Sequence, residues 1–225
     1  GIHTISIEGA FPKFYFNNLG DKDKITSVNN WGNITYSLDQ INSFWGCSNL
    51  TTLAEDIEWI NSVTNAVQMF RDNSLTTLPS GMTLVSLTDG TQLFYGNSLT
   101  TLPSAMTLES LDNGFSMFNR NSLEVLPSGM TLASLTNGSY MFYLNSLTTL
   151  PSAMTLASLT NGDNMFYVNT INTTRYSQLL VDLEANNPNN NVTFHGGNSE
   201  YNTTGETARD ALIVRTWTIT DGGLE

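Results

Sequence analysis

The sequence predicts an α/β solenoid, built from stacked coils of about 24 residues that each carry a short strand, a turn and a short helix. A 24-residue motif occurs four times in succession over residues 73–168, and its first and fourth copies agree at 17 positions by direct count. Apolar residues also recur at the same places in every copy. Such self-similarity is typical of stacked coils, because one unit cannot bury its apolar face alone.

The expected elements of one coil follow from its apolar positions. In the first copy, Leu75 and Leu78 precede Pro79, which predicts a brief extended strand that ends where proline removes the backbone donor. After a turn at the Asp-Gly pair, one or two helical turns are expected, with Leu93 and Phe94 filling the core. Strands of successive coils are expected to run parallel, about 4.8 Å apart.

One asparagine column is identical in all copies. Asparagine can pair with backbone groups of its own coil and of a neighbouring coil at a tight turn. We therefore expect a buried structural ladder of Asn73, Asn97, Asn121, Asn145 and Asn169.

The flanking segments predict three parts within one continuous body. Residues 1–43 alternate in polarity like strands and are expected to form an N-terminal β cap with a hairpin. Residues 44–174 are expected to form the solenoid, with degraded copies at its ends. Residues 175–225 are expected to form a C-terminal α/β cap of two helix–strand units, with Thr204 capping the second helix.

Composition limits the partners of this chain. It has 8 basic and 20 acidic residues and a net charge of −12, so a nucleic-acid partner is excluded. The 27 asparagines and 30 threonines suit an extracellular or virion surface. No apolar run approaches the ~20 residues that span a bilayer, so we expect no membrane insertion. No secretory leader is visible and the first residue is Gly1 rather than Met, so we expect either that a leader or a larger N-terminal part has been removed or that this is an excised domain.

Three segments resemble the BspA-like leucine-rich repeat proteins, a family of bacterial surface proteins also found in phage tail and fibre proteins, especially around Bacteroidetes. They are residues 31–50, 63–70 and 216–223, where Val-Thr-Asn, Met-Phe and Phe-Trp-Gly-Cys-Ser-Asn-Leu match the family pattern. The central copies depart from it, since asparagine replaces the cysteine and glycine stands where methionine is usual. The resemblance implies a leucine-rich-repeat-like fold and a surface location, and it implies no catalytic residues.

The residues offer little for catalysis. His3 and His195 have no partners at ligand spacing, and Cys47, the only cysteine, falls on a core column. The Asp21 and Asp23 pair is interleaved with lysines, which counts against calcium. We expect no enzyme activity, no cofactor and no metal.

Four columns change freely between copies while the core columns hardly change. Their spacing is expected to place them on one face of the short helix, and the mixture of aromatic and polar side chains suits protein or glycan recognition. Drift of exposed positions after duplication is the alternative explanation. We call the following candidate binding face the variable band: Thr91, Gln92, Tyr95, Phe115, Ser116, Asn119, Arg120, Ser139, Tyr140, Tyr143, Asp163, Asn164 and Tyr167.

A second candidate surface carries the threonine pairs of the expected strands, interrupted at Glu124 and Val125. That interruption counts against ice binding by regular threonine rows.

The expected function is a non-enzymatic binding module of a phage tail or virion that attaches to a host-surface protein or glycan. A bacterial adhesin is one alternative, and an architectural subunit that contacts other virion proteins is another. A homo-oligomer is left open.

Overall fold

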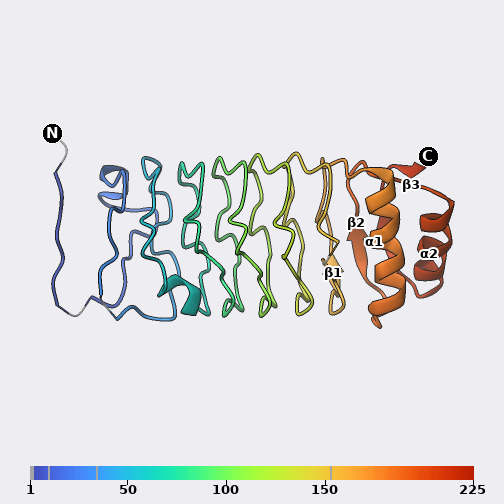
Figure 1. Ribbon diagram of the computed structural model, residues 1–225, viewed down its shortest axis with the longest axis horizontal. Coiled ribbons are helices and arrows are strands. Elements are labelled where there is room, and N and C mark those ends of the chain that lie inside the picture. Colours follow the sequence, from blue (N-terminus) through green and yellow to red (C-terminus); the bar gives the residue numbers. More distant parts are fainter. Residues whose placement is uncertain (1–2, 10, 34, 153) are drawn as a thin grey trace.

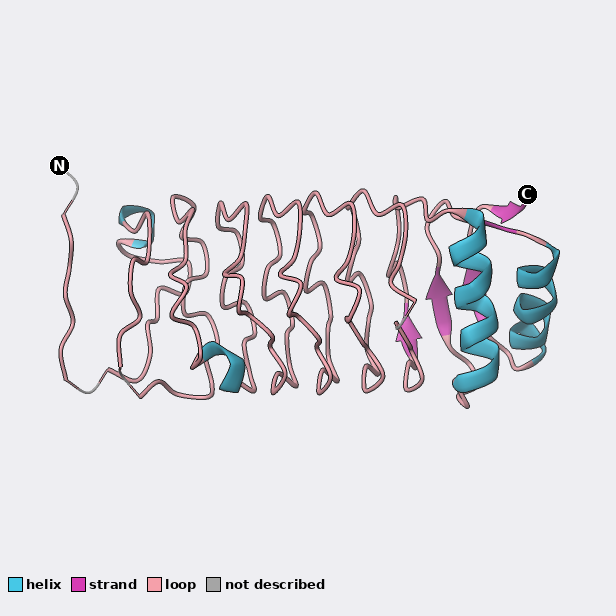
Figure 2. Ribbon diagram, in the orientation of Figure 1, coloured by secondary structure: helices cyan, strands magenta, loops and turns pink. Residues whose placement is uncertain are grey.

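The computed structural model describes residues 3–9, 11–33, 35–152 and 154–225. Residues 1–2, 10 and 34 of the expected N-terminal cap, and residue 153, lie outside this part. The chain forms an elongated stack of coils that runs from the N-terminal end to a pair of helices at the C-terminal end (Figure 1). Most of the stack consists of loops and turns, and regular elements gather at the C-terminal end (Figure 2).

Parallel pairing joins successive coils along one line. β1 (Asn161–Gly162) pairs with β2 (Thr193–His195), which pairs with β4 (Thr218–Thr220). The same line continues toward the N-terminus as single parallel bridges. The side chain at each bridge accepts a hydrogen bond from the backbone N–H two residues later, which fixes the turn. These bridge residues are Asp39, Asn65, Asp89, Asn113, Asn137 and Asn161.

The prediction that a short helix follows each bridge is wrong. Gln92 has a φ of 54°, in the left-handed region, and Ser116, Tyr140 and Asn164 repeat this conformation. Alternate backbone N–H groups donate to the next coil: that of Gln92 donates to the Phe115 carbonyl at 2.8 Å. The N–H of Leu93, between two such groups, donates to the Gly90 carbonyl three residues back at 3.0 Å, so no N–H of this turn donates four residues back. Left-handed non-glycine residues cost conformational energy, and these coil-to-coil hydrogen bonds offset it.

The prediction of a strand at each Leu-x-x-Leu segment is also wrong, since none of the described segments forms one. Few backbone hydrogen bonds join coils here: the Ser98 N–H donates to the Leu75 carbonyl at 3.0 Å. In the described part of the four copies, only the last has a second one, from the Thr148 N–H to the Glu124 carbonyl at 3.3 Å. The N–H of Leu75 donates to Oδ1 of Asn97 at 3.0 Å rather than to a backbone carbonyl. A side-chain amide therefore takes a place that a strand partner would have filled.

Stacked phenylalanine rings fill the centre of the core. Phe70, Phe94, Phe118 and Phe142 are at most 1% exposed, and neighbouring rings in this series lie with centroids 5.6–5.9 Å apart and planes within 15°. Phe44 and Phe166 extend the series with spacings of 5.4 and 5.5 Å. Columns of buried leucine and methionine surround the rings, so each coil buries its apolar face only against its neighbours.

The asparagine ladder links neighbouring coils through both ends of each amide. Nδ2 of Asn121 donates to the Phe94 carbonyl of the preceding coil at 2.9 Å and to the Phe118 carbonyl of its own coil at 3.1 Å. Its Oδ1 accepts from the Leu99 N–H at 3.0 Å. The same pattern holds for Asn97, Asn145 and Asn169.

Asn73 departs from the predicted ladder. It is buried, but neither its Nδ2 nor its Oδ1 has a hydrogen-bond partner within the described chain. The preceding coil carries Cys47 at this column, and the backbone groups of its turn pair within that coil. The N–H of Cys47 donates to the Phe44 carbonyl at 3.3 Å, and the Leu50 N–H donates to the Cys47 carbonyl at 2.8 Å. The functional ladder is therefore one member shorter than expected.

The N-terminal β cap is not seen in the described residues. Residues 3–9 are extended and exposed, and the region holds one short 3-10 helix, η1 (Lys22–Lys24), with no β-strand. The stack already includes this region, because the Phe16 N–H donates to the Ser43 carbonyl at 3.1 Å and the Phe14 ring lies 4.9 Å from Phe44. No structural break occurs at the expected boundary between residues 43 and 44. A second 3-10 helix, η2 (Ile60–Ser62), lies in the coil with an insertion.

Two helices cover the C-terminal end, as predicted. In α1 (Thr173–Asn186) the leucines expected on one face, Leu179, Leu180 and Leu183, are all buried. The second helix, α2 (Thr203–Val214), is capped by Asn202, whose Oδ1 accepts from the N–H groups of Thr204 and Gly205. The predicted cap at Thr204 was therefore two residues late.

Polar contacts hold the elements of this cap together. β3 (Glu200–Tyr201) pairs with β5 (Gly223–Leu224). The carboxylate of Asp221 accepts from the Tyr176 hydroxyl at 3.0 Å and from Nε of Arg209 at 2.9 Å. The Asp221 side chain is 3% exposed, so this pair joins α1, α2 and the β4–β5 loop inside the cap.

Truncating a central ring should destabilise the whole stack. We expect Phe118→Ala to lower the free energy of unfolding by about 3–5 kcal/mol, because the ring is fully buried between two others. Chemical denaturation checks this value. A loss below about 1 kcal/mol would show that the ring stack contributes little.

The two kinds of ladder asparagine should respond differently to truncation. Asn121→Ala should cost about 1–3 kcal/mol, because it leaves the buried Leu99 N–H without a partner and removes one of the two ladder amides that donate to each of the Phe94 and Phe118 carbonyls. Asn73→Ala should cost less than about 1 kcal/mol, because it removes no hydrogen bond. Equal losses in denaturant titrations would contradict the assignment of Asn73 as a broken end of the ladder.

Candidate binding surface

Several acidic side chains in the N-terminal part of the stack pair with backbone N–H groups or with other side chains. Asp56 accepts from the N–H groups of Trp31 and Gly32 at 3.0 Å, and Glu55 accepts from the Ser80 N–H at 2.9 Å. Asp23 accepts hydrogen bonds from Lys22 at 2.9 Å and from the Ser48 hydroxyl at 2.8 Å, and these two hydrogen bonds lower its pKa. In the part of the chain that the structure describes, no group of three or more His, Cys, Asp or Glu residues could hold a metal ion.

The histidine and cysteine side chains have structural surroundings. Nδ1 of His195 accepts from the Gly197 N–H at 3.0 Å, and partial burial lowers the pKa of this histidine. Cys47 is fully buried, which raises the pKa of its thiol to about 12. A thiol in such surroundings is a poor nucleophile.

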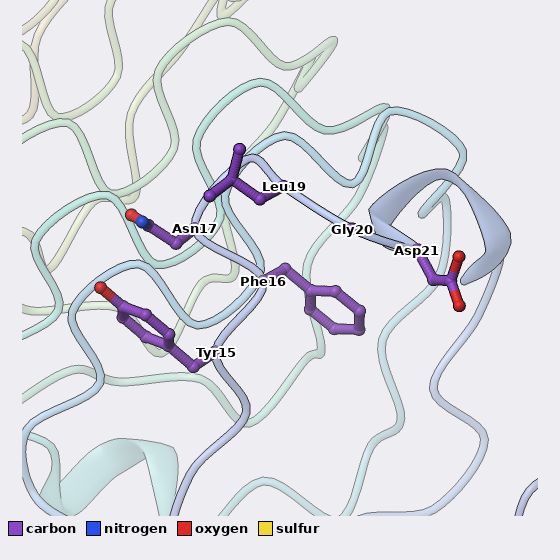
Figure 3. Close-up of a pocket in the computed structure, with 6 residues that line it drawn as sticks. All are labelled: Tyr15, Phe16, Asn17, Leu19, Gly20 and Asp21. Atoms are coloured by element: carbon purple, nitrogen blue, oxygen red, sulfur yellow. The ribbon is translucent and has the colours of Figure 1, made fainter.

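Two shallow hollows lie near the ends of the molecule. One of about 290 Å³ is lined by residues 15–17 and 19–21 near the N-terminal end, with Asp21 as its only carboxylate (Figure 3). The other, of about 630 Å³, lies between α1 and α2 and is lined mainly by threonine and alanine, with Glu184 as its carboxylate. Neither lining brings together a pair of acidic groups or a nucleophile with a base.

The structure divides the variable band into exposed and buried members. Ser116, Asn119 and Ser139 are at most 6% exposed, so the prediction that they contact a partner from the surface is wrong. Small side chains at these places are enclosed by the coil and by larger side chains of adjacent coils. The remaining members are half-buried or exposed: Thr91, Gln92, Tyr95, Phe115, Arg120, Tyr140, Tyr143, Asp163, Asn164 and Tyr167.

Aromatic rings of the variable band form one run of contacts across successive coils. Phe115 and Tyr140 meet edge to face with centroids 6.0 Å apart, and Tyr140 lies 5.4 Å from Tyr143. Tyr143 stacks on Tyr167 at 5.1 Å, and Tyr167 meets His195 at 5.3 Å. The run therefore continues beyond the repeats into the C-terminal cap.

A second run combines rings with guanidinium groups. Arg71 lies 5.1 Å from the Trp45 ring and 4.9 Å from the Tyr95 ring, and Arg120 lies 5.8 Å from Tyr95. Polar contacts hold Arg71 in place: its Nε donates to Asp72 at 3.1 Å, and its NH1 donates to Oε1 of Gln92 at 2.6 Å.

Sequence reasoning missed three of these residues, although a signal was present. In each coil the residue that follows the core phenylalanine lies in one column, whose members are half-buried or exposed except for the buried Asn119. Degraded copies supply its outer members, which were not compared with the four clear copies. We call this set the outer column: Trp45, Arg71, Tyr95, Asn119, Tyr143, Tyr167 and His195.

The second candidate surface is exposed as well. Thr76, Thr100 and Thr148 are exposed, and the row is interrupted by exposed Glu124. In the parallel row, Val125 is 46% exposed. A charged and an apolar side chain thus stand where a regular threonine row would need hydroxyls.

The burial of Cys47 predicts an unreactive thiol. In the native protein at pH 8, well below its pKa of about 12, Cys47 should not react with a thiol reagent such as DTNB within an hour. In guanidinium chloride the reaction should reach one thiol per chain. Fast stoichiometric reaction of the native protein would contradict this placement.

Among the described residues, no helix is both long and apolar enough to cross a bilayer. Searches against protein-family models, curated proteins and solved structures return no match for this chain.

Proposed function

We propose that this chain is a non-enzymatic binding module of an extracellular or virion surface, in first place a phage tail or virion domain that attaches to a host surface. One observation carries the proposal: the exposed members of the variable band put aromatic rings and Arg120 side by side on successive coils. Aromatic and arginine side chains dominate binding energy at interfaces. The resemblance to BspA-like leucine-rich repeat proteins supports the surface location.

The charge of the chain supports contact at short range. With a net charge of −12, the protein is repelled at a distance by an anionic cell envelope. Added salt screens that repulsion, so binding through rings and amides should persist or strengthen as ionic strength rises. Salt dependence therefore distinguishes this surface from one that depends on exposed cations.

The alternatives use the same structure in other ways. A bacterial cell-surface adhesin would present the variable band to a host protein or glycan. An architectural subunit would contact other virion proteins and need no ligand on the band. The broken threonine row is the specific observation against a threonine-based surface such as an ice-binding face.

A combined substitution tests the band. The quadruple variant Phe115→Ala, Arg120→Ala, Tyr140→Ala and Tyr143→Ala should lose at least about tenfold in binding to Bacteroidetes cells or envelope fractions, because it removes the proposed anchors. Binding is measured with fluorescent protein across an ionic-strength series.

A matched variant on the threonine side serves as the control. Thr76→Ala, Thr100→Ala, Glu124→Ala and Thr148→Ala change four exposed positions on successive coils, outside the variable band. This variant should bind like the wild type, and circular dichroism should show that both variants are folded. Equal binding by both variants and the wild type would refute the band and favour the architectural alternative.

A further inference from the structure

We propose that the partner of the variable band is a neutral, linear polysaccharide that lies along the stack, with successive sugar residues on successive coils. This inference rests on the proposed function and names the chemical class of its ligand. It concerns the exposed rings of the outer column and the amides beside them.

The spacing along the outer column supports a polymer with a short repeat. Successive groups in the column lie 5.1, 4.9, 5.1 and 5.3 Å apart, for the pairs Trp45 with Arg71, Arg71 with Tyr95, Tyr143 with Tyr167, and Tyr167 with His195. Parallel backbone pairing imposes this distance, because hydrogen-bonded strands lie about 4.8 Å apart. The spacing is close to the length of one pyranose residue in an extended chain. On either side of Asn119, side chains of the outer column therefore meet equivalent parts of consecutive sugars.

The geometry of the rings leaves aromatic surface free. Tyr143 and Tyr167 are nearly parallel, with planes 10° apart, and their centroid distance of 5.1 Å is that of an offset stack. Tyr167 is 41% exposed and Tyr143 is half-buried, so part of both side chains stays open to solvent. The C–H face of a pyranose ring packs on such a surface, while phenol hydroxyls at the rim pair with sugar hydroxyls.

Amide groups beside the rings supply partners for hydroxyls. Gln92 and Asn164 are half-buried members of the variable band. Asn119 lies in the outer column between Tyr95 and Tyr143. Its Nδ2 donates to Oγ of Ser116 at 3.3 Å, but its Oδ1 is buried and has no hydrogen-bond partner in the described part of the chain. Because Asn119 is enclosed, the half-buried amides of Gln92 and Asn164 are the ones that sugar hydroxyls can reach.

Charge favours a neutral polymer over an acidic one. Arg71 is paired with Asp72 at 3.1 Å, and the band also carries Asp163. Arg120 is the only basic residue between Arg71 and Arg175. An anionic polysaccharide would meet repulsion from a chain of net charge −12 and few cations along its path.

Native electrophoresis through gels that contain a polysaccharide tests this assignment directly. Separate gels contain hydroxyethyl cellulose, xylan, mannan, dextran or, as the acidic comparator, polygalacturonate. The wild type should be retarded by at least one neutral polymer and not by polygalacturonate. The double variant Tyr143→Ala and Tyr167→Ala should raise the Kd for that polymer at least about tenfold. Tyr15→Ala, which truncates a tyrosine that is 63% exposed outside the band, should not change it. No retardation in any neutral gel, or retardation in polygalacturonate alone, overturns the proposal.

Treated cells separate failure of this inference from failure of the proposed function. Periodate destroys sugar diols, whereas protease removes surface proteins. If the chain binds polysaccharide, periodate should abolish binding to cells and protease should not. Binding that needs the variable band but survives periodate and is lost with protease would overturn the polysaccharide assignment and leave the attachment function standing. Binding that is indifferent to the band would overturn both.

Discussion

Hydrogen bonds between the backbones of successive coils are the constraint on which the rest of the structure depends. Gly90, Gln92, Phe94 and Gly96 all donate to carbonyls of the following coil at 2.8–2.9 Å. These contacts set one distance between coils. Because that distance is fixed, phenylalanine rings stack in the core, ladder amides reach two coils at once, and side chains of the outer column lie one above another. Core and surface thus share one period.

This constraint also explains why the surface can vary while the core does not. A core side chain such as Phe118 touches equivalent residues on both sides, so a change in one coil disturbs its neighbours. The exposed and half-buried side chains of the variable band lie outside a backbone that is already hydrogen-bonded. Phe115, Arg120 and Tyr140 can therefore occupy surface positions on two adjacent coils at little cost to the fold.

The two ends of the stack differ in whether the polar groups at the end of the asparagine ladder find hydrogen-bond partners. At the C-terminal end, the Ile171 N–H donates to Oγ of Ser199 at 2.8 Å, so a hydroxyl takes over from the ladder amide, and the ion pair of Arg209 with Asp221 fastens the final helix. At the N-terminal end, the longer coil with Cys47 leaves Asn73 without partners. At the C-terminal end a serine hydroxyl takes the place of the next ladder amide, so the last N–H is paired. At the N-terminal end an inserted residue changes the position of the preceding turn, so the amide of Asn73 stays unpaired.

The sequence by itself determined the period, the core columns, the asparagine column and the two C-terminal helices, because each depends on a pattern within one chain segment. It could not determine that Gln92 is left-handed or that Leu75 donates to an amide, because those N–H groups pair with a coil more than twenty residues away. Only the tertiary structure buried Ser116 and Asn119 and joined His195 to the outer column. The exposure of a small side chain depends on the size of its neighbours in adjacent coils, and inserted residues hide the alignment of degraded copies until the backbones are stacked.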